Sequence, residues 1–262
     1  MNGRIATCQF EPVVGDVAAN LDRIRSLAAE SDADLAVFPE LCVTGYDLDA
    51  AGEYAAEIPG RLTAPLVEIA AATGTELVVG LPERDGETLY NTFALVDGSG
   101  VQATYRKYYR WGDEATAFEA GAGPVVAETS VGRVGFVLCY DLNFPELALT
   151  YAREECDLLA VGAAWRASFR SNWRLLCRSR ALDGPCYVAA ANHRGEQRGR
   201  QHAGTSLIAG PEGSVLSETG DGPGTATASV DDAALRAAHE RNPIQETRAK
   251  VTDPRCRRGE DE

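Results

Sequence analysis

Short apolar runs alternate with amphipathic stretches from the start of the chain. Residues 4–10 and 35–38 have the apolar character of short strands, and between them apolar residues recur at helical spacing over 17–28. Asp16 stands at the start of that stretch, where its side chain can cap a helix by accepting a hydrogen bond from a free backbone N–H. The opening therefore predicts a strand, a helix and a second strand.

The same alternation continues along the chain. Further helices are expected over 62–73, 145–155, 169–182 and 232–240. The Asp-Gly-Ser-Gly stretch at 97–100 lies between two extended runs and predicts a hairpin. Residues 106–124 predict a loop with short helical pieces. The remaining strands are expected over 76–81, 89–96, 101–105, 133–139, 158–162, 186–191, 204–209, 214–216 and 225–230.

Alternating strands and helices joined by hairpins predict a layered α/β fold. The strands are apolar enough to need cover on both faces. Helices can cover one face and a second sheet the other. Periodicity does not separate that sandwich from a doubly wound single sheet, so both arrangements stay open. We expect one domain over residues 1–250 and a polar tail over 251–262, frayed over its last residues.

Size and composition narrow the class of protein. A chain of 262 residues that is 45% hydrophobic is long enough to bury a sizeable core. No run of 18 apolar residues occurs, so no membrane span is expected. The first ten residues have no apolar signal-peptide region and are expected to form a strand. We therefore expect a cytoplasmic protein.

The charge of the chain is strongly acidic. A formal net charge of −14 repels phosphate backbones and anionic lipids, so nucleic acids and membranes are poor partners. Lys107 and Lys250 are the only lysines, against 23 arginines. This bias has two explanations that stay open here, a cytoplasm of high salt content or a GC-rich genome that exchanges Lys for Arg.

Cysteine and histidine usage argues against a metal centre. The chain has seven cysteines and no C-x-x-C motif, and most of the cysteines lie in apolar stretches, as expected for buried thiols in a reducing compartment. Its three histidines lack zinc-ligand spacing relative to any pair of cysteines. We expect neither a metal nor a cofactor.

Residues that could take part in catalysis lie at the ends of three expected strands. Glu40 follows the strand over 35–38, Lys107 follows that over 101–105, and Cys139 ends that over 133–139. Ligands of α/β proteins usually bind at strand ends. A thiol needs a base and gains from a nearby cation, and an amide under attack needs positive charge at its oxygen. Each residue alone has a structural explanation, as a buried thiol, a cap or a surface cation, and the combination favours nucleophilic catalysis.

These strand ends resemble motifs of the nitrilase superfamily of carbon–nitrogen hydrolases. The resemblance continues weakly through 178–192, 204–208 and 211–213 and so covers nearly the whole chain. The three main motifs occur in the family's order and are Phe38-Pro39-Glu40-Leu41 with Gly45-Tyr46, Tyr105-Arg106-Lys107, and Cys139-Tyr140-Asp141-Leu142-Asn143-Phe144-Pro145-Glu146.

The resemblance implies a fold and a set of roles. The fold is a four-layer α-β-β-α sandwich, often paired into dimers or higher homo-oligomers. Glu40 acts as the base, Cys139 attacks the carbonyl carbon to form a thioester, and Lys107 holds the oxyanion together with the backbone N–H of Tyr140. A second glutamate is usual after the lysine. Glu114 matches it best, and Glu119 is the rival position.

Further positions follow from the same resemblance. Tyr46, Trp165 and Asn192 lie where the family lines or supports its pocket, and each is also a credible packing residue. Asp141 is expected to organise the turn after Cys139. Where the family often has His-Leu or His-Phe after its lysine, this chain has Tyr-Tyr-Arg-Trp over 108–111, which puts the shape of the pocket in doubt.

The function implied is hydrolysis of a small amide to an acid and ammonia, by an enzyme acting on carbon–nitrogen bonds other than peptide bonds. The sequence around Cys139 is closer to the amidase-like branches than to the true nitrilases. Hydrolysis of N-carbamoyl amines or nitriles by the same three residues is the alternative. A Cys–His hydrolase using His193 or His202 fits less well. An inactive binding or scaffold protein is the non-enzyme alternative.

Overall fold

Two six-stranded sheets form the body of the protein in the computed structural model, which describes residues 2–250. The strands of the first sheet, in the order in which they lie side by side, are β14 (Gly224–Asp231), β1 (Asn2–Gln9), β2 (Leu35–Val37), β3 (Glu76–Asp85), β4 (Thr88–Asp97) and β5 (Gly100–Arg106). Those of the second are β13 (Val215–Glu218), β12 (Leu207–Ala209), β9 (Tyr187–Asn192), β8 (Leu158–Ala163), β7 (Gly132–Leu138) and β6 (Val126–Thr129).

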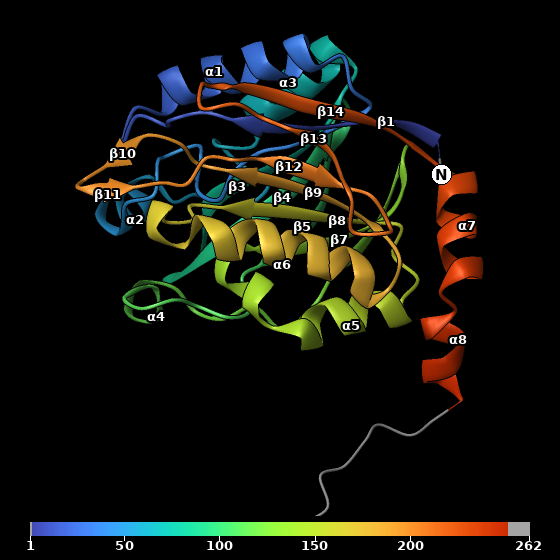
Figure 1. The fold of residues 1–262 in the computed structure, drawn as a ribbon. Helices are drawn as coiled ribbons and strands as arrows, with labels where there is room; N and C mark the ends of the chain where they lie inside the picture. Colours follow the sequence, from blue (N-terminus) through green and yellow to red (C-terminus); the bar gives the residue numbers. More distant parts are fainter. Residues whose placement is uncertain (1, 251–262) are drawn as a thin grey trace, which may run out of the picture.

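Helices cover the outer face of each sheet. Helices α1 (Val17–Ser31) and α3 (Ala64–Thr73) pack on the first sheet, and α5 (Pro145–Arg153) and α6 (Arg170–Asp183) pack on the second (Figure 1). The expected four-layer α-β-β-α sandwich is therefore confirmed, and the doubly wound single sheet is excluded.

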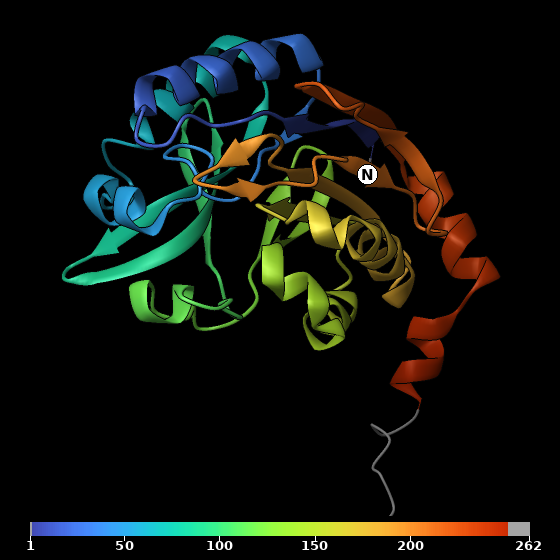
Figure 2. The same ribbon diagram turned by 60° about the vertical axis from the view of Figure 1, so that its left-hand side comes forward.

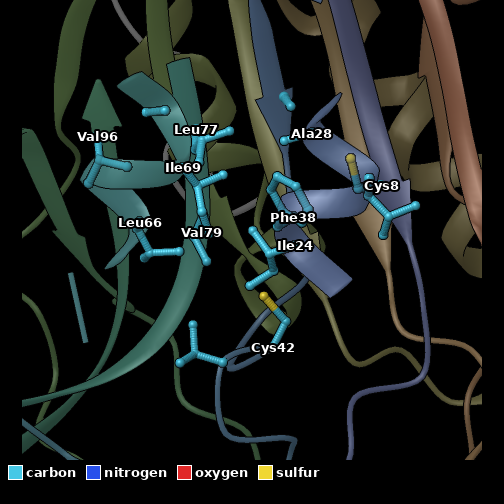
Figure 3. Packing of buried hydrophobic residues seen from close by; sticks show 14 of the residues in the cluster. Cys8, Ile24, Ala28, Phe38, Cys42, Leu66, Ile69, Leu77, Val79 and Val96 are labelled. Carbon is cyan, nitrogen blue, oxygen red and sulfur yellow. The ribbon is translucent and has the colours of Figure 1, made fainter. Parts of the chain in front are cut away.

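Alternating side chains explain why the strands are apolar throughout. In β2, Leu35 and Val37 point into the layer between the sheets, and Ala36 points into the layer under the helices. Figure 3 shows the second of these layers, where Ile24 of α1 and Ile69 of α3 pack toward the first sheet. A strand buried on both faces needs apolar side chains on both, which gives a continuous run.

The helix cap expected at Asp16 is present, and Asp231 caps the last of the predicted helices. Asp16 accepts a hydrogen bond from the backbone N–H of Ala19 at 3.0 Å, and Asp231 accepts one from that of Ala234 at 2.7 Å. The second bond opens α7 (Asp232–Arg241), which is followed by α8 (Ile244–Ala249) along one side of the sandwich (Figure 1). Within residues 2–250, no helix is long and apolar enough to cross a bilayer.

Several elements were not predicted. The strand expected to end at 81 runs on to Asp85 and forms a long hairpin with β4, which projects from the body in teal in Figure 2. Pro82 and Glu83 concealed this continuation, because both disfavour a central strand. Glu83 is nevertheless buried there, bonded to Thr92 and Arg106. Also unpredicted are β6, α2 (Leu48–Tyr54), α8 and the small hairpin of β10 (Glu196–Gln197) and β11 (Arg200–Gln201).

The loop expected over 106–124 does contain a short helix, α4 (Glu114–Ala117). Two 3₁₀ turns, η1 (Cys139–Asn143) and η2 (Ala167–Phe169), follow β7 and β8. The predicted tail over 251–262 lies outside the described residues.

Candidate active site

The three chemical residues lie at strand ends that converge. Strands β2 and β5 run in the same direction within the first sheet, so Glu40 and Lys107 follow them at one edge. In the second sheet, β7, β8 and β9 run parallel, and Cys139 follows β7. Side chains from both sheets thus meet where these strands end, because the sheets pack face to face.

Lys107 is held between two carboxylates. Its Nζ lies 2.6 Å from Glu40 Oε1 and 2.7 Å from Glu114 Oε2, and all three side chains are at least 98% buried. Burial alone would lower the pKa of Lys107, but the two carboxylates outweigh it, so this pKa is raised well above its ordinary value. The lysine is therefore a permanent buried cation.

Both carboxylate oxygens of Glu40 accept hydrogen bonds from buried groups. Its Oε1 also accepts a hydrogen bond from Asn91 Nδ2 at 2.9 Å, and its Oε2 accepts one from the backbone N–H of Ala164 at 3.1 Å. Burial raises the pKa of Glu40 above its ordinary value, although Lys107 opposes this. A raised pKa makes a carboxylate a stronger base for proton transfer near neutral pH.

The backbone around Glu40 approaches β3 closely. A Cβ on Gly80 would lie 2.4 Å from the carbonyl oxygen of Pro39 and 2.5 Å from the backbone nitrogen of Leu41. Only glycine allows this approach.

Cys139 sits at a sharp turn between a strand and a 3₁₀ helix. Its φ of +48° lies in the left-handed region, which costs energy for a residue with a side chain. Asp141 stabilises the turn by accepting hydrogen bonds from the backbone N–H of Leu138 at 3.0 Å and of Tyr109 at 2.7 Å. The expected organising position of Asp141 is thus seen directly.

The surroundings of the Cys139 thiol favour its protonated form. Burial raises its pKa well above the ordinary value, and the Glu40 carboxylate raises it further, whereas Lys107 acts in the opposite direction. A thiolate therefore has to form as the proton leaves, with a base at hand to receive it.

The two rival glutamates differ sharply in position. Glu114 is buried, and besides its contact with Lys107 it accepts hydrogen bonds from Tyr46 Oη at 2.8 Å and from the backbone N–H of Trp111 at 2.7 Å. Glu119 is 70% exposed and pairs with Arg110 at 3.8 Å. Only Glu114 of the two contacts the lysine.

A cavity of about 200 Å³ opens beside the thiol. Of the residues predicted to line the pocket, Tyr46, Tyr140 and Trp165 do so. Asn192 stands behind the wall, where it accepts a hydrogen bond from the backbone N–H of Trp165 at 2.8 Å. The other lining residues were not predicted and are Trp111, Asn143, Ala164, Arg166, Phe169, Asn172 and Arg200.

Asn91 is the main contact residue that sequence reasoning missed. It lies on β4, is buried, and donates to both Glu40 and Glu114, at 2.9 and 3.5 Å. The sequence signal that could have identified Asn91 is an amide side chain inside an otherwise apolar run. A buried amide needs hydrogen-bond partners, so such a residue indicates a polar contact in the core.

Both ring nitrogens of His193 have partners other than the thiol. His193 is fully buried, with Nε2 2.6 Å from the backbone carbonyl oxygen of Glu40 and Nδ1 3.1 Å from Gln197 Nε2. Burial lowers the pKa of His193 to about 3 and that of His202 to about 4. Among the described residues, no group of three or more His, Cys, Asp or Glu side chains forms a potential metal site.

Comparison with known proteins shows which family the chain resembles along nearly its whole length. The family model described as carbon–nitrogen hydrolase matches residues 4–240. The protein named "Hydrolase in pqqF 5'region" from Pseudomonas protegens is 36% identical, covering 94% of this chain and 86% of that protein. An omega-amidase from Danio rerio is 33% identical, covering 88% of this chain and 89% of that protein.

Solved structures agree as well. The amidase from Nesterenkonia sp. AN1, in a doubly substituted form in complex with acrylamide, is 32% identical with a TM-score of 0.83, covering 92% of this chain and 97% of that one. The chain therefore belongs to the carbon–nitrogen hydrolase family, and its expected place in the nitrilase superfamily is confirmed. It is a hydrolase of carbon–nitrogen bonds other than peptide bonds.

Proposed function

We propose that the protein hydrolyses a small amide to a carboxylic acid and ammonia through a thioester on Cys139. Sγ attacks the amide carbon while its proton passes to Glu40. Glu40 then gives this proton to the leaving nitrogen, and the C–N bond breaks to release ammonia. Water next loses a proton to Glu40 and attacks the thioester, which releases the acid and returns the proton to Sγ.

Lys107 stabilises the charge that develops in both steps. The amide oxygen becomes an oxyanion when sulfur or water adds to the carbon. A buried ammonium and the backbone N–H of Tyr140 stabilise this charge without reorganising at the moment of reaction. Glu114 gives Lys107 a second carboxylate partner, so the ammonium stays in place while Glu40 gains and loses a proton.

One observation carries this proposal. Lys107 is clamped between Glu40 and Glu114, beside a cavity that Cys139 lines. A buried ion pair contributes little to stability after desolvation, so a cluster of three buried charges next to a thiol favours catalysis over packing. The related amidases support an amide as the substrate, and the acrylamide complex of one of them supports a small one.

The test measures ammonia release from a panel of simple amides, with N-carbamoyl amines and nitriles beside them. Cys139→Ala is expected to abolish turnover. Glu40→Gln is expected to slow it at least 100-fold, as for loss of a general base. Cys156→Ala, at a thiol away from the cavity, serves as the control and keeps full activity. Mass spectrometry of the quenched wild type should find the acyl adduct on Cys139.

The same panel separates the alternatives. Turnover confined to N-carbamoyl amines or nitriles assigns the reaction to those classes, with the same residues. Amide hydrolysis that survives in Cys139→Ala contradicts the assigned nucleophile. A folded wild type that is silent on the whole panel leaves the function open between an untested substrate and an inactive binding or scaffold protein.

We also propose a cytoplasmic location and a homo-oligomeric assembly, a dimer or larger. Light scattering on the purified protein measures the assembly. Thermal unfolding in low salt and in molar KCl tests the high-salt explanation of the acidic, lysine-poor composition, because a loss of stability in molar KCl counts against it.

A further inference from the structure

Asn91 contacts both carboxylates of the buried charge cluster. Its Nδ2 lies 2.9 Å from Glu40 Oε1, a normal hydrogen bond, and 3.5 Å from Glu114 Oε1, a weak one. Lys107 Nζ contacts the same two oxygen atoms, at 2.6 and 2.9 Å. Glu40 Oε1 therefore accepts hydrogen bonds from two donors, one a cation and the other a neutral amide.

The Asn91 side chain is oriented for its amide nitrogen at the expense of its oxygen. Within residues 2–250, Asn91 Oδ1 is buried and has no hydrogen-bond partner. Such an atom costs stability, and the reversed orientation of the amide would place this oxygen against two carboxylates. An apolar side chain would avoid the cost, so packing alone does not account for an asparagine at this position.

The other oxygen of Glu40 lies near the thiol. Among the described residues, Oε2 accepts one hydrogen bond, from the backbone N–H of Ala164 at 3.1 Å. The same N–H also forms a hydrogen bond with Cys139, whose pKa it lowers. Oε2 and Sγ are therefore both next to one backbone N–H group, and Oε2 keeps a lone pair for the proton of the thiol.

The backbone of Asn91 positions the lysine as well. Lys107 directly follows β5, and its backbone N–H donates a hydrogen bond to the carbonyl oxygen of Asn91 at 2.8 Å. Asn91 thus contacts Lys107 through its main chain and Glu40 through its side chain. It ties the base and the cation to one position of β4.

We propose that Asn91 is a positioning residue that makes Oε2 of Glu40 the atom that accepts the proton of Cys139. Asn91 and Lys107 together occupy Oε1, which fixes the plane of the carboxylate. The S–H bond breaks as the Oε2–H bond forms, and Oε2 later gives this proton to the leaving nitrogen. The inference rests on the proposed thioester mechanism and adds a residue that acts through Glu40.

The same hydrogen bond favours the ionised form of Glu40. Burial raises the pKa of Glu40 and Glu114 raises it further, whereas Lys107 and Asn91 lower it. The charged or titratable groups that face Glu40 or contact its backbone are Lys107, Glu114, Cys139, Tyr46 and His193. Removal of the amide should therefore raise the pKa of Glu40, and activity that needs the ionised base should already fall at a higher pH.

The experiment compares Asn91→Leu, an apolar replacement of similar shape, with Thr92→Val at the next position of β4. Both remove a buried hydrogen bond, since Thr92 donates to Glu83 at 2.7 Å. On any amide that the wild type hydrolyses, Asn91→Leu should lower kcat at least tenfold and change KM less than about threefold. The acidic limb of its kcat/KM profile should move upward by about one pH unit, as for loss of a hydrogen bond to a charged group. Thr92→Val should keep the wild-type profile.

Alkylation gives a readout that does not depend on turnover. Iodoacetamide reacts with Cys139 once the thiol has lost its proton, and mass spectrometry of the Cys139 peptide measures the rate at each pH. The acidic limb of this rate should also move upward by about one pH unit in Asn91→Leu and stay in place in Thr92→Val. Asn91→Ala, which adds no bulk, gives the same test if the leucine variant does not fold.

The outcomes are distinct. An unchanged acidic limb in the Asn91 variants overturns the inference, as does an equal shift in Thr92→Val, which would show a general effect of β4. A shift confined to the Asn91 variants supports the inference. The alkylation shift supports it even if the protein hydrolyses no amide, so failure of the amidase function is seen separately.

Discussion

Lys107 Nζ lies 2.6 Å from Glu40 Oε1, and neither side chain exposes more than 1% of its surface. A buried ion pair of this kind costs desolvation that its attraction only partly offsets. Its second carboxylate partner, Glu114, completes the coordination of the ammonium. Because the two carboxylates raise the pKa of Lys107, the arrangement favours a positive charge next to the thiol.

The first prediction concerns Glu114, the second carboxylate that contacts the lysine. Glu114→Gln should lower kcat at least tenfold, equivalent to about 1.4 kcal/mol, because Lys107 loses a charged partner and its position. KM should change less than kcat. Steady-state kinetics on any amide that the wild type hydrolyses checks this. The control is Glu119→Gln, whose exposed side chain should contribute nothing measurable. A larger loss at Glu119 than at Glu114 would reverse the assignment of the second glutamate.

The second prediction concerns the close approach at Gly80. Gly80→Ala places a Cβ against the backbone of Pro39 and Leu41, which flank Glu40. We expect destabilisation by about 1–3 kcal/mol, the cost of overpacking a core, together with a loss of activity as Glu40 moves. Urea unfolding and kinetics measure the two effects. Gly52→Ala is the matched control, because its Cβ would meet only Leu89 at 3.8 Å. Full activity in Gly80→Ala would contradict the tight packing behind Glu40.

The third prediction uses the pKa of His193, which is about 3 in the folded protein against an ordinary 6.5. As the pH falls below 6.5, His193 binds a proton in the unfolded chain but stays neutral in the folded protein. Its contribution to the free energy of unfolding is therefore fully present above pH 6.5 and declines toward pH 3. The decline from this group approaches about 1.4 kcal/mol per pH unit. His193→Gln keeps an N–H donor for the Glu40 carbonyl and removes the titration.

Urea unfolding at pH 7, 6 and 5 checks the sign. The stability of the wild type should fall more steeply than that of His193→Gln, and the difference between the two cancels the contributions of His202 and Asp141. The variant should still form the acyl adduct on Cys139, because His193 bonds to the backbone of Glu40 instead of the thiol. If the free energies of unfolding of the wild type and His193→Gln change equally with pH, the lowered pKa of His193 is contradicted. Loss of the acyl adduct in His193→Gln supports the Cys–His alternative.

Local pattern was enough to predict much of the fold. The apolar runs predicted most strands within a few residues, since a strand buried on both faces needs apolar side chains at every position. Asp16 was recognisable as a helix cap because capping involves only the next three residues. The end of β3 was predicted too early because of Pro82 and Glu83. Glu83 is stable inside the strand only through hydrogen bonds to residues distant in sequence.

The sequence by itself determined the order of the chemical motifs and the strand ends that carry Glu40, Lys107 and Cys139. The tertiary structure alone decided which glutamate reaches Lys107, that Asn91 joins Glu40 from 51 residues away, and that Arg166 and Arg200 face one cavity. The physical reason is the distance along the chain over which each interaction acts. Propensities and caps act over a few residues of chain, whereas side-chain contacts depend on strand register and on how two sheets meet.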